Sequence, residues 1–153
     1  ENEKRKKARE LAHNALSKSP VAPRTYSGSA QMPISGIIKV RYLDQDKFGA
    51  KSQGIRIEGR AGGLVVAPMS GNIKFAGPFK GYDNMIIVDH GDGYHSLIAG
   101  LEKVDTLVGQ SVSAGEPIGH LKSGTGDQKP SLYFELRYKG EAVNPARKLT
   151  DLG

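Results

Sequence analysis

The sequence predicts a mainly β protein, a sandwich or barrel of antiparallel strands with one α-helix in front of it. Twenty glycines and eight prolines, with four phenylalanines and no tryptophan, are typical of many turns between short strands. The first eighteen residues, by contrast, are helix formers. With 153 residues and 37% hydrophobic content, we expect one core rather than two.

The expected helix covers residues 1–18 and carries a narrow apolar stripe. Its apolar side chains recur at three- and four-residue spacing, at Ala8, Leu11, Ala12, Ala15 and Leu16. Fewer than three heptads are present, so three interpretations stay open: the end of a coiled coil, a regulatory arm folded onto the domain, or a plain amphipathic helix.

A linker is expected over residues 19–31, because Pro20, Pro23 and Gly28 stand there without apolar periodicity. The compact domain is then expected over residues 32–153. Its predicted strands are 36–42, 54–58, 64–67, 71–75, 84–90, 94–101, 111–112, 117–121 and 132–138.

Two of these segments carry a sharper prediction. Residues 85–88 are apolar at four consecutive positions, which predicts a strand covered on both faces. Asp92-Gly93 lies between two strands and tolerates positive φ, which predicts a tight hairpin.

The formal net charge is +6, from 22 Lys and Arg against 16 Asp and Glu, and several of the positive charges lie in the first ten residues. The sign alone does not choose between nucleic acid, an acidic polymer and an acidic protein. A nucleic-acid module lacks support, because the aromatic-plus-basic strand motif of such folds is missing.

The composition excludes further classes of site. There is no cysteine, so disulfides, thiolate metal sites and a cysteine nucleophile are excluded. No stretch approaches the apolar length of a membrane span. Because the chain starts at Glu1 without a methionine, we expect a longer parent protein.

Seven segments together carry a family resemblance. They are PISG (33–36), FG (48–49), VVAPMSGNIKFAG (65–77), GYDNMIIVDHGDGYHSL (81–97), VGQSVSAGEPIG (108–119), SLYFELR (131–137) and GEAVNP (140–145). In this order and spacing they resemble the LytM, or lysostaphin-like, zinc metallopeptidase domain from about residue 33 to 149. The resemblance implies a lysostaphin-like fold of antiparallel strands.

The resemblance also implies that the zinc ligands have been replaced. Active members hold zinc with a His-x-x-x-Asp pair and the second histidine of a His-x-His pair, which leaves one position open for the reactive water. Here Ser52 and Arg56 stand at the first pair and Ser131 and Tyr133 at the second, while Gly100 stands at a further histidine position. Arg56 adds a permanent positive charge, which opposes a divalent metal. We therefore expect neither a metal cofactor nor catalysis.

Other candidates for chemistry are weaker. His90 and His95 lie on opposite sides of the predicted hairpin, and their spacing does not require that they share a metal. His13 and His120 are isolated in the sequence. We therefore expect structural roles for these histidines. No Gly-x-Ser-x-Gly motif surrounds Ser52 or Ser131, which argues against a serine hydrolase. The glycine-rich stretch 124–129 lacks the full phosphate-loop pattern.

The segments 131–137 and 140–145 are most similar to EnvC-type murein hydrolase activators of Gram-negative bacteria. This resemblance implies a non-catalytic activator that binds a periplasmic N-acetylmuramoyl-L-alanine amidase through the former active-site groove and relieves its autoinhibition during cell division. An upstream helical region would link the domain to a membrane division complex. Direct binding of peptidoglycan without catalysis is the alternative.

Strand alternation places positions 131, 133, 135 and 137 on one face, which would line that groove. The predicted groove residues are Ser52, Gln53, Arg56, Tyr82, Ile98, Gly100, Ser131, Tyr133 and Arg137.

Overall fold

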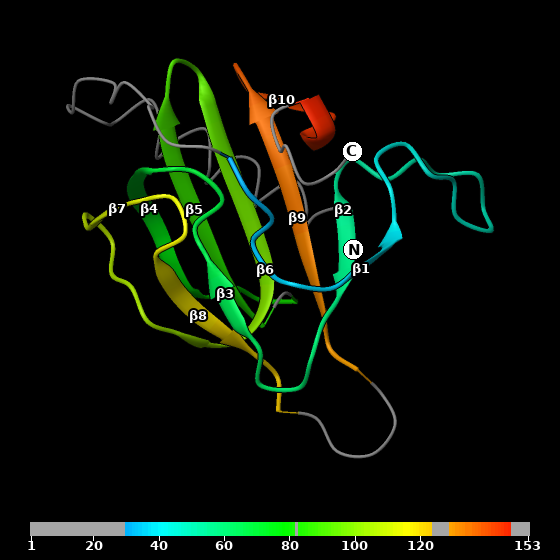
Figure 1. Ribbon diagram of the computed structural model, residues 1–153. Helices are drawn as coiled ribbons and strands as arrows, with labels where there is room; N and C mark the ends of the chain where they lie inside the picture. The colour runs from blue at the N-terminus through cyan, green and yellow to red at the C-terminus, as the bar shows by residue number, and fades with distance from the viewer. Residues whose placement is uncertain (1–29, 82, 124–128, 148–153) are drawn as a thin grey trace.

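A computed structural model describes residues 30–81, 83–123 and 129–147 (Figure 1). The expected helix 1–18 and residues 19–29 of the expected linker lie outside this part of the chain. Within it, the strands are β1 (Ile37–Val40), β2 (Ile55–Glu58), β3 (Leu64–Val66), β4 (Gly71–Pro78), β5 (Asn84–Gly91), β6 (Tyr94–Val104), β7 (Ser111–Val112), β8 (Pro117–Leu121), β9 (Ser131–Tyr138) and β10 (Glu141–Val143). A short 3₁₀ helix, η1 (Pro145–Arg147), follows.

All strand pairs are antiparallel, in the order β1-β2-β9-β6-β5-β4-β7. Two further pairings branch from this path, β10 with β9 and β8 with β6 and β3. The long strands β4, β5, β6 and β9 run side by side through the middle of the molecule (Figure 1). The predicted mainly β, lysostaphin-like class of fold is confirmed.

Strand β5 is buried on both faces, as predicted. Met85, Ile86, Ile87 and Val88 are fully buried. Ile86 and Val88 pack into the main core, whereas Met85 and Ile87 pack on the opposite face of the sheet in a second, smaller cluster. Because successive strand residues point to opposite faces, a continuous apolar run is what a doubly covered strand requires.

The predicted hairpin at Asp92-Gly93 connects β5 to β6. Asp92 has φ 54° and Gly93 has φ 86°, both in the left-handed region that these residue types tolerate. The hairpin also contacts the end of β9, because the Lys139 N–H donates to the Gly93 carbonyl at 2.8 Å.

Strand β10 was not predicted. The strand has only three residues, Glu-Ala-Val, and this segment is too short and too polar to form an apolar run. The strand forms because Lys139 (φ 49°) and Gly140 (φ 85°) make a tight turn that folds it back onto β9.

Two residues that precede the predicted start of the compact domain contact it. Ala30, placed in the linker by its composition, is 5% exposed and packs in the main core. The Gln31 N–H donates to the Pro68 carbonyl at 2.9 Å. No helix among the described residues is long and apolar enough to cross a membrane.

Candidate partner-binding face

Strand β9 presents two different faces to the protein. Leu132, Phe134 and Leu136 point into the main core. The alternate residues Tyr133 and Glu135 lie on the opposite face, where Tyr133 packs against the smaller cluster. We call this side of the sheet the Tyr133 face. The alternation that the sequence predicted for β9 therefore sets the orientation of its side chains.

Tyr133 lies between strands β2 and β6. It is paired with Arg56 on one side and with Ala99 on the other. The Arg56 guanidinium carbon lies 5.7 Å from the centroid of the Tyr133 ring, at a distance suited to a cation–π contact. Two positions that the resemblance assigned to zinc ligands therefore hold an arginine and a tyrosine in contact with each other.

Gly54 makes room for the tyrosine ring. A Cβ atom at this position would lie 2.8 Å from Tyr133 Cζ and 2.5 Å from the Phe134 carbonyl oxygen. Ser52 supports the same bend, because its hydroxyl donates to the Gly54 carbonyl at 2.7 Å. The chain before β2 is thus shaped around Tyr133.

Glu135 joins the polar side chains of β9 into one network. The Tyr133 hydroxyl donates to Glu135 Oε1 at 2.6 Å, and Arg137 Nη1 donates to Glu135 Oε2 at 2.5 Å. Arg137 Nη2 also donates to the Gly140 carbonyl oxygen. Glu135 is 2% exposed and Arg137 is 8% exposed. Hydrogen bonds to both oxygens offset the cost of burying a charged carboxylate.

This network corrects the expected role of Arg137. As a predicted groove residue, Arg137 was expected to be open to a partner. The structure instead shows a buried side chain paired with Glu135, so Arg137 contributes mainly by holding Glu135 in place. A neighbouring carboxylate two positions earlier on the same strand face was the sequence signal for this pair.

Apolar side chains form the rest of the Tyr133 face. Met85, Ile87, Leu97 and Ala99 make up the buried cluster, and partly buried Phe75, Phe79 and Tyr133 pack against it. Phe75 and Phe79 meet edge to face, with ring centroids 6.1 Å apart. These residues were not among those predicted for the site. The register of β6 with β9 decides which residues lie on this face, and sequence alone does not give that register.

The same register removes Ile98 from the site. Ile98 pairs with Phe134 and is buried in the main core, on the other side of the sheet. It was assigned to the groove because the apolar run at residues 97–99 does not reveal which residues face which side. Its neighbours Leu97 and Ala99 are the ones on the Tyr133 face.

The remaining predicted residues are placed as follows. Gly100 has φ 102°, and a Cβ atom there would lie 3.0 Å from the Ser131 carbonyl oxygen, so these two residues are neighbours. Gln53 is exposed and directly precedes Gly54. Tyr82 lies outside the described residues.

The residues at the expected ligand positions do not fit a zinc ion. The Ser52 and Tyr133 hydroxyls both donate hydrogen bonds within the protein, and Arg56 is an exposed cation. Among the described residues, no group of three or more His, Cys, Asp or Glu side chains is placed to hold a metal. Zinc prefers imidazole, thiolate and carboxylate ligands.

His90 has a structural environment. Its Nδ1–H donates to the Ser70 carbonyl at 2.9 Å, and Nε2 accepts from the Ser96 hydroxyl at 2.7 Å. Burial lowers the pKa of His90 to about 4, although the Ser70 carbonyl and the Asp89 charge act in the opposite direction. The ring is therefore neutral at pH 7, as its two hydrogen bonds require.

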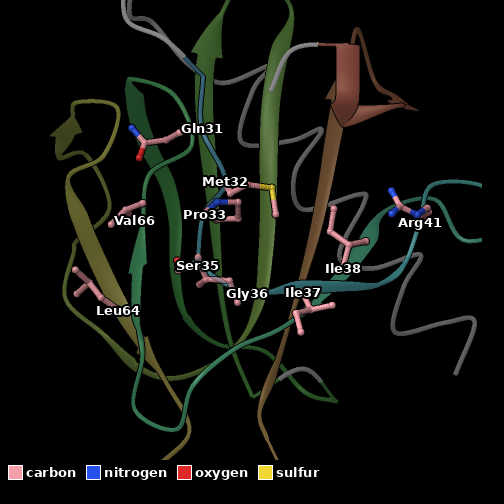
Figure 2. A pocket seen from close by; sticks show the side chains of 11 residues that line it. Gln31, Met32, Pro33, Ser35, Gly36, Ile37, Ile38, Arg41, Leu64 and Val66 are labelled. Carbon is pink, nitrogen blue, oxygen red and sulfur yellow. The ribbon is translucent and has the colours of Figure 1, made fainter. Parts of the chain in front are cut away.

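A separate pocket lies on the side of the main core (Figure 2). Its volume is about 690 Å³, and it is lined by residues 31–38, by Arg41, and by Leu64 and Val66 of β3. None of the predicted site residues that the structure describes lines it. The pocket and the Tyr133 face are therefore distinct surfaces.

With this geometry in place, comparison with known proteins identifies the family. The model of "Peptidase family M23" matches residues 50–145, which include β2 to β10 and both predicted ligand positions. The chain belongs to peptidase family M23. The M23 domain is thus the scaffold on which the Arg56–Tyr133 contact is built.

Curated relatives of this M23 domain include murein hydrolase activators. The chain is 37% identical over 124 residues to "Murein hydrolase activator EnvC" of Escherichia coli (strain K12), covering 81% of this chain and 29% of that protein. It is also 37% identical over 139 residues to "Murein hydrolase activator NlpD" of Salmonella dublin, covering 86% of this chain and 36% of that protein. The chain spans about a third of the length of these relatives.

Solved M23 structures share the fold. A putative peptidase M23 from Pseudomonas aeruginosa superimposes with a TM-score of 0.71 at 24% identity, over 91% of this chain and 58% of that one. Lysostaphin superimposes with a TM-score of 0.69 at 27% identity, over 82% of this chain and 54% of that one. These likenesses agree with the predicted lysostaphin-like architecture.

Proposed function

We propose that this chain is a non-catalytic activator of a periplasmic N-acetylmuramoyl-L-alanine amidase and binds that enzyme through the Tyr133 face. The observation that carries the proposal is the pair of residues at the former ligand positions. Arg56 and Tyr133 contact each other there, and neither is a residue that zinc prefers. The similarity to proteins named murein hydrolase activators supports the same role.

The Tyr133 face has the composition of a protein-binding surface. Interfaces are enriched in aromatic residues and arginine, and their strongest contacts cluster around such side chains. Tyr133 supplies a half-buried ring, Arg56 an exposed guanidinium, and Phe75 and Phe79 an apolar surround. A partner segment laid across this face would cover aromatic surface and meet a fixed positive charge.

Activation on this proposal requires no chemistry from the chain. If the amidase alone is mainly autoinhibited, a protein that prefers its open form shifts the population toward that form. A preference of about 5.5 kcal/mol is enough to move the equilibrium from 1:99 to 99:1. An interface built around a few aromatic and arginine contacts can supply a preference of this order.

The proposal also includes the cellular setting. The relatives in Escherichia and Salmonella come from Gram-negative bacteria, which supports action in the cell envelope during division. The amphipathic stripe predicted for residues 1–18 suits the end of a coiled coil that would link this domain to a membrane division complex. The domain would then bring activation to the site where the wall is cut.

Direct peptidoglycan binding is the second candidate function. Arg56 is an exposed cation on the Tyr133 face, and acidic stem peptides would complement its charge. On this alternative the domain would bind purified cell-wall sacculi without an amidase.

Binding to a purified amidase tests the proposal directly. We expect saturable binding by titration calorimetry, and Tyr133→Ala should raise the dissociation constant by about ten-fold or more, the effect of a hot-spot residue. Leu107→Ala is the matched control, because Leu107 is an exposed apolar residue outside the proposed interface. Binding to sacculi without amidase binding would instead support the alternative.

A further inference from the structure

An ordered hairpin projects from the sheet between β1 and β2. This hairpin, residues 41–53, is here called the finger and is the cyan segment at the right of Figure 1. Its two arms are joined by backbone hydrogen bonds from Leu43 N–H to the Ser52 carbonyl (2.7 Å) and from Ser52 N–H to the Asp44 carbonyl (2.9 Å). A bridge between Gln45 and Lys51 continues the pairing toward the tip. The finger is therefore a built element of the fold.

The acidic residues of the finger are used to fold it. Asp44 accepts the Arg41 N–H at 2.7 Å, and Asp46 Oδ1 accepts the N–H groups of Phe48 (2.8 Å) and Ala50 (3.0 Å). These are the contacts by which aspartate stabilises tight turns. Both aspartates are nevertheless exposed, so their charges offset part of the positive charge of the finger.

The finger also carries three cations, Arg41, Lys47 and Lys51, which exceed its two aspartates by one. All three are exposed, and no ion pair links them to a carboxylate in the part of the chain that the structure describes. With this small positive excess, Lys47 and Lys51 near the tip attract an acidic surface over roughly a Debye length, about 8 Å at physiological ionic strength. The finger is thus suited to an acidic partner.

The tip of the finger displays an aromatic ring. Phe48 is 84% exposed, and the Lys47 ammonium lies 5.3 Å from its ring centroid. Leu43, 49% exposed on the same finger, has φ 70°, an unfavourable conformation for leucine that the paired arms hold in place. An exposed ring on a rigid turn can enter a pocket at little cost in conformational entropy.

The finger is continuous with the Tyr133 face. Ser52 pairs with the finger's first arm through its backbone and donates its hydroxyl to Gly54, which lies against the Tyr133 ring. Any molecule seated on Arg56 and Tyr133 therefore meets the base of the finger.

We infer that the finger is a second contact arm for the protein that binds the Tyr133 face. Phe48 enters an apolar pocket on that protein, and Lys47 and Lys51 meet carboxylates at the rim of the pocket. The inference rests on the proposed function, and it adds an aromatic anchor and the charge of the partner's matching surface.

A lipid surface fits the finger less well. Stable membrane attachment generally requires two substantial anchoring signals, such as an acyl chain with a cluster of basic residues. The finger offers one aromatic ring and three cations, two exposed aspartates oppose an anionic surface, and the cations lie beside a predicted protein-binding face. A protein partner therefore explains the position of the finger as well as its composition.

The test is the affinity of the chain for a purified N-acetylmuramoyl-L-alanine amidase. We expect Phe48→Ala to raise the dissociation constant by about ten-fold or more, as for other aromatic anchors. Leu107→Ala, at a similarly exposed apolar residue on a different turn, should leave it unchanged. Circular dichroism checks that both variants fold. We expect both to fold, because both substituted side chains are exposed.

Charge reversal tests the acidic rim separately. Lys47→Glu with Lys51→Glu should slow association at low salt, with the difference shrinking as salt rises. Arg60→Glu is the control, because Arg60 is an exposed cation beyond the other end of β2. Equal association rates for these two variants would overturn the acidic partner surface.

The outcomes separate this inference from the proposed function. If Tyr133→Ala weakens binding and Phe48→Ala does not, the finger inference is wrong while the proposed function stands. If the unaltered chain does not bind the amidase, the proposed function itself fails.

A Phe48→Trp variant tests the lipid alternative, because the chain has no tryptophan of its own. A blue shift of its emission with phosphatidylglycerol vesicles, without amidase, would overturn the choice of a protein partner. Unchanged emission with these vesicles supports that choice.

Discussion

At the scale of single residues, the Tyr133 face is organised by Glu135. One of its oxygens accepts the Tyr133 hydroxyl, and the other accepts the Arg137 guanidinium. Because the carboxylate is buried, these two donors stabilise its charge in place of water. Glu135 therefore fixes the position of the tyrosine that the proposed partner would contact.

Removing this charge should be costly. We expect Glu135→Gln to lower the free energy of unfolding by about 3 kcal/mol, since it leaves the Arg137 cation buried without a counter-charge. Tyr133→Phe should cost less, about 1.5 kcal/mol, because it removes one hydrogen bond to a charged group. Urea unfolding at pH 7 measures both values. A Glu135→Gln variant as stable as the unaltered chain would show that the network does not hold the face together.

His90 should make stability depend on pH. Its pKa is about 4 in the folded chain and 6.5 as a free side chain, so below pH 6.5 the unfolded chain binds a proton that the folded chain does not. Stability is thus expected to fall as the pH is lowered from 6.5 toward 4, by at most about 3 kcal/mol.

The His90→Gln variant isolates this contribution from those of the other histidines. It should be less stable at pH 7, because the Ser70 and Ser96 contacts are disturbed, but its stability should change less between pH 7 and 4.5. Urea unfolding at the two pH values gives the comparison. Parallel losses in both proteins would mean that His90 is not the titrating group.

At the scale of elements, every strand except β10 was predictable, whereas the register of the strands was not. Turn residues and apolar runs located β2, β5, β7 and β8 closely, because these signals are local in the sequence. Which face each residue of β6 occupies depends on its pairing with β5 and β9, a long-range property. The assignment of Ile98 to the site was wrong for this reason.

The same distinction applies to the candidate site. Tyr133 and Arg56 were named because a family pattern marks their positions, and the structure brings them together. The burial of Arg137 and the apolar cluster around Met85 depend on how strands stack, so no local motif revealed them.

The approach of β2 to β9 depends on Gly54. We expect Gly54→Ala to lower the free energy of unfolding by about 1–3 kcal/mol, because the new methyl group must displace the Phe134 carbonyl or the Tyr133 ring. Gly109→Ala is a useful comparison. Gly109 has φ 93°, and an added Cβ would meet no atom within 4 Å, so this substitution measures only backbone strain. Thermal unfolding of both variants gives the values. A Gly54→Ala protein with unaltered stability would contradict the tight contact.

At the scale of the whole molecule, an M23 fold carries a face on which Arg56 and Tyr133 stand at positions that the family resemblance assigned to zinc ligands. The sheet supplies rigidity from two apolar clusters, one on each side of β5. A rigid, preformed surface binds a partner with little loss of conformational entropy. This is the physical basis on which the proposed activator would act by binding.

The most direct test of this account is the hydrolysis of labelled peptidoglycan by a purified periplasmic amidase, with and without the chain. We predict that the chain alone releases no label, that it accelerates the amidase, and that Tyr133→Ala abolishes the acceleration while Leu107→Ala preserves it. Release of label by the chain alone, stopped by a metal chelator, would contradict the account, because it would mean that the domain is itself a metallopeptidase.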